Sequence, residues 1–242
     1  MSNLIREQFQ AMINQQVTSN LTDDLLSLFE LDDAMPNMLE ILNDPDQRMR
    51  KYAAVNFRLV VEKQWEALED NGSAESYLNQ FLKFLQKETD NNIIENFMHS
   101  IERVLEKYGS MWLDLFNFAF EIAQTRTVTA LIILVYATHT VENDFICQIA
   151  ESIIQLVSQA ATTITDKKGK VRAFQLFAEA FDRDEPLFQP YPDSFLQIFS
   201  LMMETYVNDL KNPVQPMAQA EEIVNLESEV ISTVLRLSLI HI

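Results

Sequence analysis

Apolar residues recur along this chain at the spacing of amphipathic helices. In residues 36–68 a short apolar run, a polar turn at 43–45 and a longer amphipathic segment that reaches Trp65 follow one another. Apolar positions at i, i+3, i+4 and i+7 are typical of one buried helix face. The stretch therefore predicts two helices joined by a tight turn. Neither helix can bury its apolar face alone, whereas helical pairs stacked on further pairs can.

The turn carries its own capping signals. Asp44 is suited to cap the second helix, Pro45 fits the first helical position, and Gln47 stands where a capping box has Glu or Gln. These residues predict that the second helix begins directly after Asp44.

The remaining segments repeat this pattern of helix, polar turn and helix. Further helices are predicted over residues 3–16, from Asn20 or Thr22 to 29, and over 73–87, 93–108, 111–123, 127–138, 145–161, 170–181, 194–210 and 217–236. Gly109 is expected to end one helix, residues 166–169 to form an exposed turn, and residues 183–193 to form a proline-bearing linker. Residues 127–138 are dense in β-branched side chains, and their helical neighbours favour a helix there over a strand.

An apolar–any–apolar–apolar pattern marks the first helix of each pair. It begins at positions 39, 82, 113, 154 and 196, so its spacings are 43, 31, 41 and 42 residues. Three of these spacings lie near the ~40–47 residues of HEAT-type helical pairs. The sequence thus predicts an all-α fold, a right-handed α-solenoid of about five to six such pairs. The alternative is a helical bundle with a fixed number of helices.

Composition supports the helical prediction and narrows the class of partner. Only 3 of 242 residues are glycine, far fewer than the turns of a sheet-rich protein need. The formal net charge is −18, from 36 acidic and 18 basic residues. Such a field repels nucleic acid and anionic lipid and attracts basic partners. Acidity of this kind also serves solubility alone, and composition does not separate these two roles.

The sequence lacks the patterns that indicate catalysis or cofactor binding. Three histidines and one cysteine offer no metal-ligand spacing, and no Gly-rich phosphate loop or GxSxG motif occurs. Cys147 lies in an apolar segment and is interpreted as a core residue. The longest apolar run, 130–137, is far shorter than the ~20 residues of a membrane span. With no long apolar run near residue 1, no signal peptide is expected. We predict no enzyme activity, cofactor, direct nucleic-acid contact or membrane insertion.

Residues 50–65 carry a family resemblance. Their landmarks are Arg50, the pair Ala53–Ala54, the pair Phe57–Arg58 and the closing Trp65. This segment, with the short helix before it, resembles the N-terminal domain of the importin-β superfamily. It is most similar to the importins that carry ribosomal proteins and histones. Phe57 stands where leucine is more common. In this interpretation the small alanines allow close helix approach, and Trp65 fastens the helix end to the next pair.

The resemblance implies a nuclear transport receptor that shuttles between cytoplasm and nucleus. It implies binding of Ran in its GTP form through the N-terminal repeats, basic protein cargo such as ribosomal proteins or histones on an inner surface lined by second helices, and contact with nucleoporins. The candidate Ran-binding residues are Arg50, Lys51, Asn56, Arg58 and Lys63. Residues 1–72, with a core at 36–68, would form the importin-like region, and residues 73–236 further HEAT repeats.

Two alternatives to an importin remain open at this stage. One is a HEAT-repeat scaffold or adaptor of a multiprotein complex; the other is an exportin of the same superfamily. Separately, the last six residues, 237–242, resemble a translated transposase end sequence used in preparing sequencing libraries. We expect these six residues to be non-native, the chain to be an N-terminal fragment cut within its fifth pair, and an apolar surface to be exposed at its C-terminal end.

Overall fold

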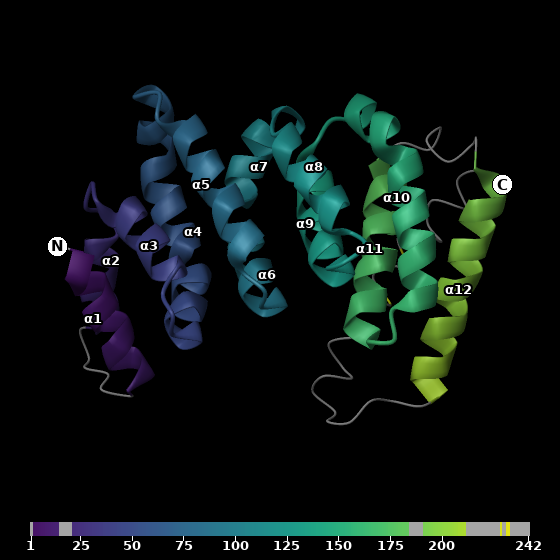
Figure 1. Ribbon diagram of the computed structural model, residues 1–242, viewed down its shortest axis with the longest axis horizontal. Helices are drawn as coiled ribbons and strands as arrows, with labels where there is room; N and C mark the ends of the chain where they lie inside the picture. Colours follow the sequence, from purple (N-terminus) through teal and green to yellow (C-terminus); the bar gives the residue numbers. More distant parts are fainter. Residues whose placement is uncertain (1, 15–20, 184–190, 212–227, 229–230, 233–242) are drawn as a thin grey trace. The chain divides into compact units, whose positions relative to one another are not determined.

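The computed structural model describes residues 2–14, 21–183, 191–211, 228, 231 and 232 (Figure 1). Within these ranges every regular element is an α-helix or a single 3₁₀ turn, which confirms the all-α prediction. Residues up to Tyr108 and residues from Gly109 onward form two compact units. The expected boundary at residue 72 falls inside the first unit.

The first unit is built around one long helix, α4. The helices of this unit are α1 (Ser2–Ile13), α2 (Leu21–Leu28), α3 (Ala34–Leu42), α4 (Gln47–Asp70), α5 (Ala74–Lys87), α6 (Asn91–Ser100) and α7 (Glu102–Tyr108). Helix α4 pairs with α3 across the predicted turn and packs most extensively on α6, with further contacts to α1, α5 and α7. Its apolar positions are buried on several sides, so α4 organises the packing of this unit.

The second unit continues the alternation of first and second helices. It contains the 3₁₀ turn η1 (Gly109–Met111), α8 (Leu113–Ile122), α9 (Thr127–Thr140), α10 (Asn143–Thr163), α11 (Lys167–Arg183) and α12 (Pro192–Lys211). Helix α9 packs on α8 and α11, while α10 packs on α11 and α12. The β-branched segment is a helix, as predicted, and residues 129–135 within α9 are all buried.

An aromatic cluster joins the α3–α4 pair to the next pair. Phe97 of α6 lies 5.3 Å from Phe57, 5.5 Å from Phe81 and 4.7 Å from Phe84, measured between ring centroids. Trp65, near the end of α4, packs on Phe81 of α5 and on Tyr108 of α7. The predicted role of Trp65, fastening the helix end to the next pair, is confirmed.

The alanine pair lies where α4 meets α6. Ala53 and Ala54 are fully buried, and the Ser100 hydroxyl donates a hydrogen bond of 2.8 Å to the Ala54 carbonyl. A side chain from one helix can reach the backbone of another only where no bulky group separates them. The predicted close approach of two helices at this pair is therefore confirmed.

Several predicted helix ends were wrong by a few residues. Asp46, not Asp44, caps α4, since its carboxylate accepts from the backbone N–H of Arg48 at 2.9 Å. The helix predicted over 93–108 is interrupted at Ile101, which separates α6 from α7. The expected exposed turn at 166–169 is incorrect because α11 already begins at Lys167 and buries Gly169.

Gly109 and Cys147 also differ from expectation. Gly109 follows the end of α7, as predicted, but it begins the 3₁₀ turn, and a Cβ there would lie 2.8 Å from Oγ1 of Thr140. The Thr140 side chain therefore lies too close to position 109 for any residue but glycine to fit without a shift. Cys147 is exposed rather than buried, because it lies outside the buried face of α10 that Ile146 and Ala150 form.

Some predicted segments fall outside the described residues. These are most of the linker at 183–193, most of the helix at 217–236, and the six residues 237–242.

Candidate functional site

Helix α4 presents an exposed stripe that is mostly polar. Arg48, Lys51, Val55, Arg58 and Glu62 are all exposed and follow one another in steps of three or four residues. That spacing places them along one side of the helix. The opposite side is buried by the apolar residues that contact α3 and α6. Three of the five sequence candidates flank or belong to this stripe: Lys51, Asn56 and Arg58.

The charges of this stripe oppose the helix dipole. The cations Arg48, Lys51 and Arg58 lie in the first half of α4, and Glu62, Glu66 and Asp70 lie in the second half. No acidic residue occupies the first turn and no basic residue the last. A helix is stabilised by the reverse arrangement, since its N-terminus is partially positive. At the N-terminal turn the acidic cap Asp46 offsets Arg48, and within the helix Arg58 pairs with Glu62.

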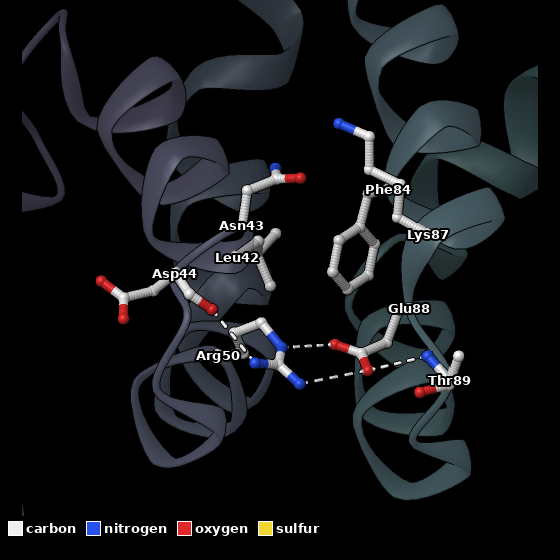
Figure 2. A pocket seen from close by; sticks show the side chains of 8 residues that line it. All are labelled: Leu42, Asn43, Asp44, Arg50, Phe84, Lys87, Glu88 and Thr89. Atoms are coloured by element: carbon white, nitrogen blue, oxygen red, sulfur yellow. Dashed lines mark hydrogen bonds and ion pairs between the residues drawn. The ribbon is translucent and has the colours of Figure 1, made fainter.

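Arg50 connects α4 to the turn between α5 and α6. Figure 2 shows its guanidinium directed between the two helical pairs, toward Glu88. Its Nε donates to Oε2 of Glu88 at 2.7 Å, and its Nη1 donates to the backbone carbonyl of Asp44 at 3.0 Å. The side chain is only 21% exposed. Arg50 is thus held within the protein, and it ties two successive turns together.

Glu88 is the buried acceptor of this connection. It is 4% exposed and also accepts from the backbone N–H groups of Thr89 at 2.8 Å and Asp90 at 2.9 Å. Burial alone would raise the pKa of Glu88, but hydrogen bonds from Arg50 and these two N–H groups lower it below its ordinary value. A cavity of about 210 Å³ adjoins the pair, lined by Leu42, Asn43, Asp44, Arg50, Phe84, Lys87, Glu88 and Thr89 (Figure 2).

Asp44 makes the corresponding contact in the turn between α3 and α4. It is buried, and its carboxylate pairs with Arg6 of α1 and accepts from the backbone N–H of Asp46 at 2.8 Å. Each of the two turns thus holds a buried acid paired with an arginine from the preceding helical pair. Sequence reasoning missed both partners, because Arg6 and Glu88 each lie 38 residues from the residue they bind.

Lys51 and Arg58 project from α4 into solvent. Arg58 makes a 3.5 Å ion pair with Glu62 on its own helix, and both side chains are about half exposed. Lys51 has no ion pair within the described part of the chain. Burial would raise the pKa of Asp90; hydrogen bonds from Asn92, Gln47 and Ile93 and the nearby charge of Lys51 together lower it. These two cations are available to a partner.

Lys63 lies off the exposed stripe, and Asn56 lies at its edge. Lys63 makes a 2.6 Å ion pair with Glu30, which follows α2, and this pairing lowers the pKa of the Glu30 carboxyl. Asn56 is half-buried, and its amide nitrogen donates to the Tyr52 carbonyl at 2.8 Å. The structure therefore does not bring all five sequence candidates onto one surface.

A second and larger cavity lies between α1 and α4. Its volume is about 450 Å³, and its lining consists of Met12, Ile13, Arg48, Lys51, Tyr52, Val55 and Asn56. No local sequence pattern indicates this cavity, because it depends on how α1 packs against α4. Two of the sequence candidates, Lys51 and Asn56, form part of its wall.

The described residues show no metal-binding cluster. Nowhere in these ranges do three or more His, Cys, Asp or Glu side chains gather in an arrangement that could hold a metal ion. None of the helices described here is long and apolar enough to cross a membrane.

Comparison with known proteins supports the fold and no finer grouping. No family model matches the chain, and no curated protein matches it. Among solved structures the chain is similar to a crystal structure of an engineered protein from the Northeast Structural Genomics Consortium, with a TM-score of 0.53 and 11% identity, over 96% of this chain and 90% of that chain. At that identity the likeness concerns the fold alone. The chain is a helical repeat protein made of stacked helical pairs.

Proposed function

We propose that this chain belongs to a nuclear transport receptor of the importin-β superfamily. It would bind Ran-GTP through the face of α4 and carry basic protein cargo. The observation that supports the proposal is the α3–α4 pair, in which Ala53, Ala54 and Trp65 face the next pair while cations face solvent. This division between packing and exposed positions is the one that the resemblance implies.

The contacts on α4 divide the candidates into two roles. Lys51 and Arg58 are exposed and would contact Ran directly. Arg50 would act as a positioning residue, because its hydrogen bonds to Glu88 and to the Asp44 carbonyl align α4 with the turn of the next pair. Asn56 and Lys63 would contribute at the edges of this surface.

The acidic balance of the chain suits basic cargo. Glu62, Glu66 and Asp70 continue the exposed stripe of α4 beyond the cations, within a chain of net charge −18. Complementary charge raises the association rate of a basic partner and disfavours acidic ones. A receptor of this kind would separate its Ran-contacting cations from a cargo-attracting acidic region.

The test is binding of Ran-GTP to the chain and to a Lys51→Glu/Arg58→Glu variant. Reversing two contacting charges is expected to weaken binding at least tenfold, while circular dichroism stays unchanged because both side chains are exposed. A Lys83→Glu variant, altered at an exposed lysine of α5, is the matched control and should bind nearly as well as the wild type. Equal loss in the variant and the control would contradict the proposed surface.

A helical-repeat scaffold outside nuclear transport is the second candidate. The observation that supports it is the stack of helical pairs itself, an architecture that serves a scaffold as well as a transport receptor. An exportin of the same superfamily would share the α4 surface. The effect of Ran-GTP on ligand affinity distinguishes the three candidates. Ran-GTP should release cargo from an importin, strengthen cargo binding in an exportin, and leave a scaffold's ligand unaffected.

A further inference from the structure

We propose that the groove between α1 and α4 binds an acidic linear segment of a partner protein through one large apolar side chain. The apolar side chain would enter the cavity of about 450 Å³, and flanking carboxylates would meet the cations at its rim. This inference does not depend on Ran and would hold for a transport receptor or a scaffold alike.

The walls of the groove are held in place by core packing. Phe9 of α1 is fully buried, and its ring lies 6.0 Å from that of Tyr52, which lines the groove from α4. The amide of Asn56 is fixed by its hydrogen bond to the Tyr52 carbonyl. Cavities of about 300–1,000 Å³ with largely preformed walls are typical of ligand sites. This groove falls within that range before any partner binds.

The floor of the groove is apolar and open to solvent. Val55 is 53% exposed although it lies at the middle of an otherwise well-packed helix. Met12 and Ile13 of α1 are only partly buried and face the same space. Covering such a surface removes apolar area from water, which favours binding. A single inserted leucine or phenylalanine would cover all three residues.

The rim is cationic in a strongly acidic chain. Arg48 and Lys51 line the groove, Arg58 follows within two turns, and none of the described lining residues is a carboxylate. Arg48 pairs with Asp46 at 2.9 Å and Arg58 with Glu62 at 3.5 Å, so Lys51 contributes the charge that no ion pair in the described residues offsets.

The charges select the class of occupant. The groove is lined by two cations, Arg48 and Lys51, in a chain of net charge −18, so a nucleic acid or an anionic membrane would be repelled by the rest of the molecule. A second copy joined by two-fold symmetry would place one cationic groove against the other. A short acidic segment can meet the rim and the floor while touching little of the acidic surface elsewhere, whereas an extended polyanion or a membrane would lie against much more of it.

The test uses a short fluorescent peptide of Asp and Glu around one central Phe, measured by anisotropy with the whole chain. We expect saturable binding, at least tenfold weaker for Lys51→Glu and for Val55→Asp, and also weaker for a peptide with Ala in place of Phe. Lys83→Glu, which changes an exposed charge on α5, is the matched control and should change affinity less than threefold.

Three results would overturn the inference. One is no saturable binding by a chain that circular dichroism shows to be helical. Another is equal weakening by Lys51→Glu and Lys83→Glu, which would indicate diffuse charge attraction. The third is concentration-dependent self-association that Val55→Asp abolishes, which would assign the groove to a second copy of the chain.

Discussion

At the scale of single residues, the acids in the turns show how the helical pairs are joined. Asp44 and Glu88 are both nearly buried, and each is neutralised by an arginine from the preceding pair. Buried charges are tolerated only when they are paired and hydrogen-bonded. The sequence shows that Arg50 is a cation on an amphipathic helix, but it does not show that Glu88 will bind it. That contact depends on the stacking of two pairs.

Replacing Glu88 with glutamine tests this connection. The neutral side chain loses the charge-assisted bond to Arg50 and leaves the guanidinium half-buried without its counter-charge, so the free energy of unfolding should fall by about 2–3 kcal/mol. Urea denaturation followed by circular dichroism measures this loss. Glu121→Gln, at an exposed position of α8, is the control and should change stability by less than about 0.5 kcal/mol.

The same variant has a defined pH dependence. The pKa of Glu88 is lower in the folded chain than in the unfolded chain, so this group stabilises the fold fully above its unfolded pKa of about 4.3. The contribution is lost as pH falls through the folded pKa. The stability gap between wild type and Glu88→Gln should therefore narrow below about pH 4. A gap that widens on acidification would contradict the assigned role.

At the scale of helices, packing between aromatic side chains, rather than the helix propensity of each segment, positions the helical pairs of the first unit. Phe97 contacts three other rings from α4 and α5, and Trp65 extends this cluster to α7. The spacing of apolar residues predicted which positions are buried. It could not predict the ends of the helices, because Asp46 and Asp44 are both good capping residues and only tertiary contacts decide between them. Asp44 is removed from the cap by its pairing with Arg6.

Truncating Phe97 tests the cluster. Phe97→Ala should lower the free energy of unfolding by about 3–5 kcal/mol, because it leaves a cavity among Phe57, Phe81 and Phe84. Phe97→Leu keeps most of the volume and should cost no more than about 1.5 kcal/mol. Urea midpoints measured by tryptophan fluorescence report both, since Trp65 adjoins the cluster. Equal effects of the two substitutions would mean that Phe97 is not closely packed.

Gly109 offers a second test, in the second unit. A Cβ at this position would lie 2.8 Å from Oγ1 of Thr140 and 3.1 Å from Cγ1 of Val141. The Thr140 hydroxyl is itself fixed by a 3.0 Å hydrogen bond to the Ala137 carbonyl. Gly109→Ala should therefore destabilise by about 1–3 kcal/mol.

A double-mutant cycle checks the cause of that effect. Part of the cost of Gly109→Ala, about 0.5–1 kcal/mol, should disappear in a Thr140→Ala background. Gly72→Ala is the control, because Gly72 has φ +77° and nothing within 4 Å of its Cβ position. Its cost arises from backbone strain and should simply add to that of Thr140→Ala. Strict additivity at Gly109 would exclude the close approach as the reason for glycine.

At the scale of the whole chain, the sequence predicted the fold class better than the site. The repeat spacing and the scarcity of glycine indicated stacked helical pairs, and the fold is of that kind. The candidate site was chosen by resemblance along one helix, which contacts other elements on several sides. Arg50, Asn56 and Lys63 therefore have internal partners. The groove that Lys51 lines arises from α1, which the local sequence of α4 could not indicate.

The most direct test of the proposed function is the ratio of affinities of the wild-type chain for Ran-GTP and Ran-GDP. It should be measured at about 0.15 M salt, where the Debye length of about 8 Å damps attraction from distant charges. A nuclear transport receptor predicts saturable binding at least a hundredfold tighter to the GTP form. Equal affinity for the two forms, or no binding by a folded helical chain, would contradict the account and leave a helical-repeat scaffold.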